Sequence, residues 1–349
     1  MFDINIGVKV QDITINNYKA LKEFKIEFTD KDNNPLPIIV IAGINGTGKT
    51  TLLEYLAQLP EIKEKSYKIS YKNNENSCTF VKKTNFITNL AFGDVEDNCF
   101  QREDFLSHIL YIPSEDNTID NIKEIIPKYL HKIVWSEDVL ASIAFKRVRE
   151  YIDNIFQDFN LKVEFNSRDG DGNLFFKNQK GEIFSIDELS TGEKTLLSKI
   201  LYLYFKDIKN QIILIDEPEL SLHPKWQNQV LKLYENFAKE NNCQIIIATH
   251  SPHIIGSAKN EYIRLLTEDG VINNSLAYGR DIEWVLEEVM GANYTREPTI
   301  SKKIEECQKL LEEDKYDEAE KCIDEIENII GSHDSDIVAL RTSLEFWRE

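Results

Sequence analysis

Residues 38–50 read IIVIAGINGTGKT, and this stretch decides the fold. Its first five residues are a continuous apolar run, which is typical of a central strand covered on both faces. The next eight match the pattern G-x-x-x-x-G-K-[ST], and a helix-like segment follows until Pro60. The sequence therefore predicts a strand, a glycine-rich turn and a helix, in which backbone N–H groups and a helix N-terminus surround a phosphate.

The residues of this turn predict a nucleotide site with a metal. We expect Lys49 to reach the β- and γ-phosphates and the hydroxyl of Thr50 to bind Mg²⁺. The other residues expected to contact the nucleotide are Asn45, Gly46, Gly48 and Thr51. A glycine-rich turn can match the pattern by chance, but the strand and the helix around it supply the context that the motif requires.

A second apolar run, residues 212–215, ends in two carboxylates. Open α/β sheets bind their ligands at the carboxyl ends of parallel strands. We expect Asp216 to hold Mg²⁺ and Glu217 to orient and polarise the attacking water. Such a pair is commonly only the start of a solvated loop, and its place in the same predicted sheet as a phosphate loop favours the catalytic interpretation.

Residues 189–194 read LSTGEK and open a predicted helix. Taken alone, they predict only a helix N-cap. The order of the three motifs, however, resembles that of ABC-type ATPases, in the RecF- and SMC-like branch of repair and chromosome-structure proteins. In that family the Leu-Ser-x-Gly motif of one subunit caps the γ-phosphate bound to the other. The resemblance implies this role for Ser190 and Gly192, and with it a head-to-tail homodimer with two composite ATP sites.

The same resemblance implies further site residues. Residues 218–224 correspond to a loop along the dimer interface, and His250 corresponds to a switch histidine that contacts the γ-phosphate and keeps the water in line. The catalytic residues would then be Glu217, His250 and Lys49. Near the N-terminus, Lys19 stands where relatives place a residue close to the nucleotide, although a surface turn is an equal alternative.

The chain departs from the family pattern in places. The glutamine that usually binds the metal is missing after the third core strand, where Ser114 or Glu115 can substitute. Thr191 and Glu193 replace the glycine and glutamine of transporter subunits, which argues against a transporter. The segment between these two regions is also too short for the coiled-coil arm of the repair proteins.

The predicted fold class is α/β. We expect an ABC-ATPase (P-loop NTPase) fold with a mainly parallel central sheet, an antiparallel β subdomain, a helical insertion and a helical C-terminal tail. The predicted domains are an N-terminal ATPase lobe with the phosphate loop, a helical and hairpin insertion, a C-terminal ATPase lobe with the other motifs, and the tail, at residues 1–114, 115–188, 189–297 and 298–349. Residues 61–107 are expected to form hairpins or surface insertions.

Composition excludes several classes of protein. The 41 Lys and Arg residues against 60 Asp and Glu give a net charge of −19, so the surface as a whole should repel nucleic acid. A local basic groove stays open, with Lys146, Arg147 and Arg149 as candidates, although a solvated helix face explains them better. The apolar runs are too short to span a bilayer, and no secretory signal is evident, so we expect a cytoplasmic protein without membrane contact. Five cysteines without C-x-x-C spacing predict neither a disulfide framework nor a zinc knuckle.

Residues 278–349 carry a narrower resemblance. The YGRD segment at 278–281, the helix after it, Arg296 and the helical tail are similar to the ATPase component of Septu-type and retron-associated anti-phage defence systems. This implies an HNH-type nuclease as partner and leaves an assembly above the dimer open. Each predicted tail helix has one apolar face, which can pack on the ATPase core, on the other tail helices or on a second protein.

Three functions remain as hypotheses. The first is a dimeric ATPase that couples ATP turnover to a nuclease effector. The second is a scaffold that binds ATP, hydrolyses it slowly and restrains a toxic effector. The third is a DNA-repair ATPase, against which the net charge and the missing arm both argue.

Overall fold

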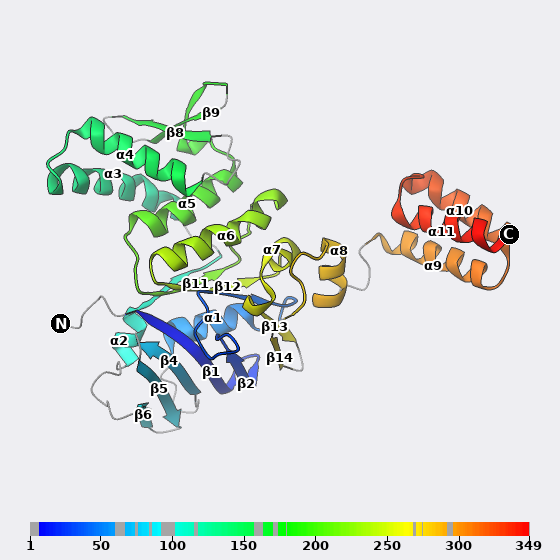
Figure 1. Cartoon of the computed structure of the whole chain (residues 1–349), viewed down its shortest axis with the longest axis horizontal. Coiled ribbons are helices and arrows are strands. Elements are labelled where there is room, and N and C mark those ends of the chain that lie inside the picture. Colours follow the sequence, from blue (N-terminus) through cyan, green and yellow to red (C-terminus); the bar gives the residue numbers. More distant parts are fainter. Residues whose placement is uncertain are drawn as a thin grey trace. The chain divides into compact units, whose positions relative to one another are not determined.

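The computed structural model describes residues 7–59, 67–73, 76–83, 86–91, 102–114, 118–156, 163–169, 174–178, 180–267, 270–273, 275–291 and 296–348. They fall into two compact units, Met1–Val285 and Leu286–Glu349 (Figure 1). The predicted tail, from residue 298 onward, lies within the second unit.

A six-stranded sheet forms the centre of the first unit. Its strand order is β14 (Gly270–Asn273), β13 (Ile263–Thr267), β3 (Ile38–Ala42), β12 (Gln244–Thr249), β11 (Ile212–Asp216) and β7 (Ile109–Ile112). The strands from β13 to β7 run parallel, whereas β14 pairs antiparallel with β13. Every residue of β3, β11 and β12 is buried, as their apolar runs predict. Because these strands are parallel, their carboxyl ends meet at one edge of the sheet.

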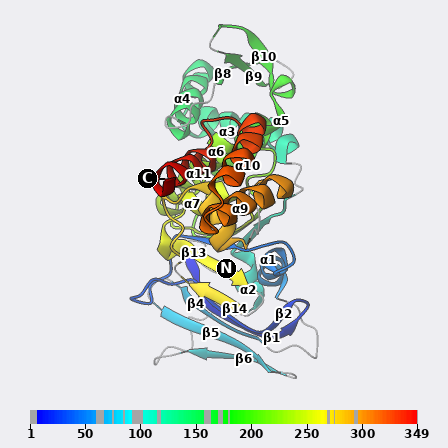
Figure 2. The same ribbon diagram turned by 90° about the vertical axis from the view of Figure 1, so that its right-hand side faces the viewer.

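A second, antiparallel sheet packs beside the first. Its strand order is β2 (Leu21–Glu27), β1 (Val8–Tyr18), β4 (Tyr67–Asn73), β5 (Asn76–Lys83) and β6 (Phe86–Ala91). In Figure 1, helix α6 (Pro224–Glu240) lies above the central sheet, and helix α1 (Lys49–Gln58) and β1 lie below it. Figure 2 shows the antiparallel strands stacked side by side at the foot of this unit.

The hairpins expected between residues 61 and 107 are present where the structure describes this segment, whereas residues 61–66, 74–75, 84–85 and 92–101 lie outside the described residues. Strands β4, β5 and β6 continue the sheet that β1 and β2 begin. Tyr67, Ile69 and Tyr71 are buried at every second position of β4. Lys68 and Ser70 between them are polar, so β4 itself has the alternation of a half-buried strand, but the sequence around it is polar and Asn-rich and resembles surface loops.

A buried amide joins the two sheets. Gln244, the first residue of β12, donates from Nε2 to the carbonyl oxygens of Val10 (3.0 Å) and Leu36 (3.2 Å). Its Oε1 accepts from the backbone N–H of Val10 at 2.7 Å. All its hydrogen-bonding groups are thus used for structure, at the end of β12 opposite to the nucleotide edge.

The insertion between β7 and the LSTGEK segment is helical and then antiparallel, as expected. It contains α3 (Thr118–Ser136), α4 (Ala141–Ile155) and the three-stranded sheet of β8 (Val163–Arg168), β9 (Leu174–Asn178) and β10 (Ile183–Ser185). The other helices of this unit are α2 (Arg102–Ser107), α5 (Thr191–Phe205), α7 (Pro252–Ser257) and α8 (Ile282–Trp284).

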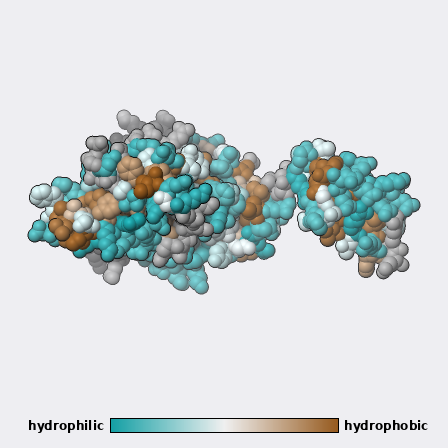
Figure 3. Space-filling view, turned by 90° about the horizontal axis from the view of Figure 1, so that it is seen from above, coloured by the Kyte–Doolittle hydropathy of each residue, from teal (hydrophilic) through white to brown (hydrophobic). Residues whose placement is uncertain are grey.

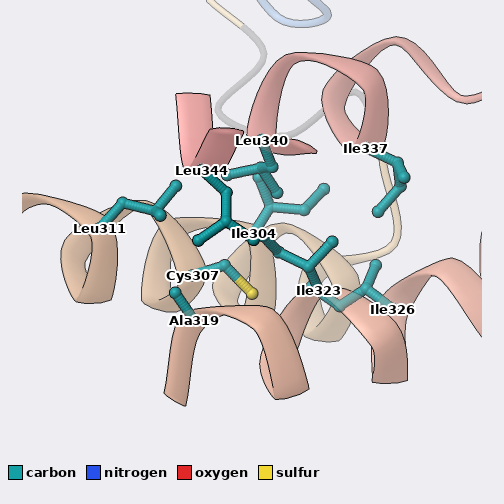
Figure 4. Close-up of a cluster of buried hydrophobic side chains, with 9 residues drawn as sticks. All are labelled: Ile304, Cys307, Leu311, Ala319, Ile323, Ile326, Ile337, Leu340 and Leu344. Atoms are coloured by element: carbon teal, nitrogen blue, oxygen red, sulfur yellow. The ribbon is translucent and has the colours of Figure 1, made fainter. Parts of the chain in front are cut away.

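The second unit is a three-helix bundle with a core of its own. Helices α9 (Pro298–Glu312), α10 (Tyr316–Ile330) and α11 (Ser335–Arg348) all contribute apolar side chains to one cluster (Figure 4). Its buried members are Ile304, Cys307, Leu311, Ala319, Ile323, Ile326, Ile337, Leu340 and Leu344. The apolar faces of the tail helices were expected to pack on the ATPase core, on one another or on a second protein. The residues of this cluster pack on one another.

A disulfide also joins two of these helices. Cys307 of α9 is bonded to Cys322 of α10. The expectation that the cysteines form no disulfides is wrong here. Their separation of 15 residues crosses a helix–turn–helix, so the bond depends on the tertiary packing of two helices and not on a short motif.

The visible surface in Figure 3 is mostly hydrophilic, with apolar residues in small separate areas. This agrees with the charged composition of the chain. Among the described helices, none combines the length and the apolarity needed to cross a membrane.

Candidate active site

The phosphate loop wraps around its own lysine. Lys49, the first residue of α1, is only 6% exposed and donates from Nζ to the carbonyl oxygens of Gly43 (2.7 Å) and Ile44 (2.9 Å). Burial lowers the pKa of Lys49, and the nearby carboxylates of Glu217 and Asp216 act in the opposite direction. The ammonium group is therefore already held at the centre of the loop, where phosphate oxygens can replace the carbonyl oxygens.

A hydroxyl and a carboxylate meet beside this loop. Thr50 donates from Oγ1 to the two carboxylate oxygens of Asp216, at 3.0 and 3.2 Å, although the residues lie 166 positions apart. Burial raises the pKa of Asp216, and the hydrogen bond from Thr50 opposes that rise. Oxygen ligands of this kind suit Mg²⁺, which usually takes its remaining ligands from water and substrate phosphates. The donor set therefore fits the metal expected from the sequence.

The predicted base and the predicted switch histidine are also brought together. Glu217 follows β11 and His250 follows β12, and Oε1 of Glu217 lies 2.9 Å from Nδ1 of His250. Glu217 has a φ of 45°, in the left-handed region that side chains rarely adopt. Backbone strain of this kind is retained where the surrounding structure enforces it, often in active sites.

Glu219 is a site residue that sequence reasoning missed. It is 5% exposed, and its Oε1 accepts hydrogen bonds from Thr249 Oγ1 and from the backbone N–H groups of His250 and Ser251, the latter two at 3.2 Å. Burial raises the pKa of Glu219. The sequence signal was the second carboxylate of the EPE triplet at residues 217–219, inside the loop predicted to lie along a dimer interface.

The LSTGEK segment opens α5, and its polar groups bond locally. Ser190 is the N-cap: its Oγ accepts from the backbone N–H of Glu193 (3.3 Å), and its own N–H donates to the Glu193 carboxylate (3.0 Å). This is a capping box. Within the described part of the chain, neither Ser190 nor Gly192 forms a hydrogen bond with the phosphate loop.

Gly192 lies against the loop after β11. A Cβ atom at Gly192 would be 2.5 Å from the carbonyl oxygen of Ser221, which is closer than real Cβ atoms approach. Ser221 itself has a φ of 65°. The glycine therefore allows the start of α5 to pack against residues 218–224 of the same chain.

Lys19 lies in the β1–β2 turn, which packs on the phosphate loop. A Cβ atom at Gly48 would be 3.6 Å from Ala20 of that turn and 3.0 Å from Leu21, the first residue of β2. The Nζ atom of Lys19 donates to Glu54 of α1 at 2.9 Å. Lys19 is thus next to the loop and paired with the helix that the loop begins.

The remaining predicted residues lie on the loop or near β7. Asn45 and Gly46 are exposed, Thr51 is half-buried in the first turn of α1, and Ser114 is half-buried just after β7. Glu115 lies outside the described residues. Burial, together with the nearby Asp216 carboxylate, raises the pKa of Tyr111 to about 12.

Family models match this part of the chain. Residues 79–256, just over half of the chain, match the model described as "AAA domain, putative AbiEii toxin, Type IV TA system". The chain belongs to this AAA-domain family. A second model, described as "AAA ATPase domain", matches residues 9–96, which include the phosphate loop.

Curated relatives of the chain include a Septu protein and a retron ATPase. The chain is 25% identical to "Septu protein PtuA" of Bacillus thuringiensis, over 87% of this chain and 90% of that protein. It is 28% identical to "Retron Vc95 probable ATPase" of Vibrio cholerae, over 76% of this chain but only 54% of that protein. The expected resemblance to Septu and retron ATPases is confirmed.

A solved structure supports the fold. The "SMC head domain from Thermotoga maritima" aligns with 77% of this chain and 100% of its own, with a TM-score of 0.50 and 14% identity. The predicted fold class, an ABC-type ATPase head with an antiparallel subdomain, an insertion and a helical tail, is confirmed.

Proposed function

We propose that the chain binds ATP with Mg²⁺ and hydrolyses it in a head-to-tail homodimer. The observation that carries this proposal is the hydrogen bond of 3.0 Å between Thr50 Oγ1 and Asp216. It joins the phosphate loop to the carboxylate end of β11, so that the lysine, the Mg²⁺ ligands and the candidate base share one edge of the sheet. Two AAA models and the SMC-head fold support the same function.

Each residue has a role that follows from its position. The backbone N–H groups of the loop, from Asn45 to Thr51, would hold the phosphates, with Lys49 on the β- and γ-phosphates. Thr50 and Asp216 would hold Mg²⁺, which neutralises charge that develops on the phosphate oxygens. Glu217 would accept a proton from the attacking water. His250 would contact the γ-phosphate and keep the water in line for attack. Lys19 would contact the nucleotide by releasing Glu54.

The second copy would supply the rest of each site. Ser190 lies exposed at the N-terminus of α5, a position that favours an anion. The contact between Ser190 and Glu193 would have to open when a γ-phosphate arrives, because the Glu193 carboxylate repels it. Gly192 would let the loop at residues 218–224 follow α5 into the interface.

A pair of variants tests whether the sites are composite. Ser190→Arg and Lys49→Ala chains should each be inactive as homodimers. Their heterodimer holds one site with both lesions and one site with neither, so part of the activity should return. A verified heterodimer without any recovery would mean either that the sites are not composite or that both sites must fire together.

We also propose a cellular role in anti-phage defence with an HNH-type nuclease. The relatives from Septu and retron systems support it. In this proposal residues 1–114 and 189–297 form the ATPase, residues 115–188 are an insertion, and residues 298–349 serve partner docking or assembly above the dimer in the cytoplasm. Co-purification with the product of a neighbouring nuclease gene tests the partner.

The alternatives differ in turnover and in charge. A scaffold that restrains a toxic effector needs the same site, so turnover compared with the rate of complex dissociation distinguishes it. DNA repair is less well supported, because two of the three basic residues on α4 are paired. Arg147 pairs with Glu137, and Lys146 lies 3.7 Å from Glu150. A salt titration of DNA binding tests the groove that remains.

A further inference from the structure

The proposed hydrolysis assigns no role to Glu219, although its carboxylate is buried beside His250 and accepts three hydrogen bonds. We propose that Glu219 is a positioning residue, which fixes the backbone of residues 249–251 so that His250 presents Nδ1 to Glu217. This inference rests on the proposed function, because Glu217 and His250 are its catalytic pair. Glu219 itself contacts neither of the predicted Mg²⁺ ligands by a hydrogen bond among the described residues.

Three donors from three consecutive residues converge on one oxygen. Oε1 of Glu219 accepts from the hydroxyl of Thr249 and from the N–H groups of His250 and Ser251, the latter two at 3.2 Å. The hydroxyl of Thr249 also accepts from the N–H of Ser251 at 2.9 Å. The last residue of β12 and the two residues after it are therefore tied to a single carboxylate 30 to 32 positions earlier in the chain.

The side chain of His250 depends on that segment. It is 40% exposed, so packing alone does not fix it. Its Nδ1 lies 2.9 Å from Oε1 of Glu217 and 3.8 Å from Oε1 of Glu219. If the backbone of His250 moved by about 1 Å, the contact with Glu217 would exceed hydrogen-bonding distance.

A buried carboxylate lowers the stability of the folded chain unless its oxygens are paired. Oε2 of Glu219 is buried and has no hydrogen-bond partner in the described part of the chain. Such a group costs free energy on folding. At the other end of β12, the neutral amide of Gln244 makes three hydrogen bonds and leaves no group unused. Packing therefore accounts for Gln244, whereas the unused oxygen of Glu219 calls for another explanation, which the positioning of His250 supplies.

The first experiment compares Glu219→Ala with Gln244→Ala as a matched control. Both residues are buried, and each substitution removes three hydrogen bonds at one end of β12. We expect Glu219→Ala to lower kcat about tenfold or more while KM and ATP affinity stay within about twofold. Gln244→Ala should lower the thermal midpoint but keep kcat within about twofold. Equal kcat losses in the two variants would overturn the positioning role.

A double variant separates positioning from general damage. If Glu219 acts through His250, Glu219→Ala should add almost nothing to the loss caused by His250→Ala. Additive losses would overturn the proposal. Glu219→Gln keeps one acceptor oxygen and the side-chain size, so it should recover most of kcat, and it remains informative if Glu219→Ala fails to fold. A Glu219→Gln variant as slow as His250→Ala would count against the backbone contacts.

A measurement without ATP keeps the two proposals distinguishable. The ring ¹H–¹³C resonance of His250, assigned by its absence from His250→Ala, should shift in Glu219→Ala and stay in place in Gln244→Ala. An unshifted resonance in Glu219→Ala would overturn the positioning role. A wild-type chain that releases no phosphate would instead overturn the proposed hydrolysis, whatever the resonance does.

Discussion

At the scale of single residues, Lys49 is the side chain on which nucleotide binding depends most. We predict that Lys49→Ala reduces ATP affinity by two orders of magnitude or more, since charge-assisted contacts worth about 2–3 kcal/mol or more are lost. Titration calorimetry measures this, with Lys25→Ala as the control because Lys25 is an exposed lysine of β2. Unchanged affinity in Lys49→Ala would rule out this loop as the phosphate site.

Asp216, which we propose as a Mg²⁺ ligand, is buried, and its charged carboxylate therefore opposes folding when no metal is bound. Its raised pKa means that the folded chain binds the proton of this carboxyl more tightly than the unfolded chain does. Binding of that proton therefore stabilises the folded chain at low pH. This stabilisation is lost as the pH rises through the raised pKa. We therefore predict that Asp216→Asn raises the thermal midpoint by a few degrees at about pH 8 without nucleotide or metal, and less at about pH 4.

Differential scanning fluorimetry across this pH range checks the effect. Asp187→Asn is the control, because Asp187 is an exposed carboxylate that pairs with Lys123. A gain that grows as pH falls would have the wrong sign and would contradict the burial argument.

The residues that the sequence could predict are those within short motifs. Lys49, Thr50, Asp216 and Glu217 stand at fixed positions around apolar runs, and the structure places them at one edge of the sheet. Their catalytic roles stay predictions. Glu219 could not be found in this way, because its partners are backbone groups of a segment that only folding brings near.

At the scale of elements, the start of α5 and the loop after β11 form one packed unit. Gly192→Ala would push a methyl group into the carbonyl oxygen of Ser221, which lies 2.5 Å from the Cβ position. We predict a loss of stability of about 1–3 kcal/mol and a loss of hydrolysis, with ATP binding retained. Chemical denaturation and calorimetry measure the two effects. Thr191→Ala, at an exposed neighbouring position, is the control.

Strands with unbroken apolar runs could be predicted, whereas strands within the polar, Asn-rich segment could not be assigned to a sheet. The buried strands β3, β11 and β12 follow from unbroken apolar runs. In β4 the buried positions alternate with lysine and serine, but the polar, Asn-rich sequence around this strand left a surface insertion as an alternative. The β5 and β6 pairing depends on that strand, which is why the width of the antiparallel sheet was not foreseen.

At the scale of the whole molecule, every predicted ATP-site residue precedes the second unit. The tail buries its own apolar cluster, but it leaves Ile329 (62%), Val338 (50%) and Phe346 (75%) exposed. We predict that a chain ending at Gly291 binds ATP with affinity within about twofold of the full chain and loses the nuclease partner or the higher assembly. Arg296 is removed as well, because it pairs with Asp334 and Asp336 of the tail.

Light scattering and co-purification measure these losses. In the full chain, Phe346→Asp should weaken the same association without disturbing the tail core, because Phe346 lies outside that cluster. A truncated chain that keeps both its partner and its assembly size would show that the tail has another role.

The proposed function requires that this site binds and hydrolyses ATP. Its most direct test is steady-state phosphate release with Mg-ATP, measured for the full chain and for Glu217→Gln. An amide keeps the shape of the carboxylate but cannot accept the proton of the water. The prediction is that the wild type releases phosphate, while Glu217→Gln binds ATP with unchanged affinity, releases no phosphate above background and accumulates as an ATP-bound dimer. Phosphate release by Glu217→Gln at the wild-type rate, or none by the wild type, would contradict the assignment of this site.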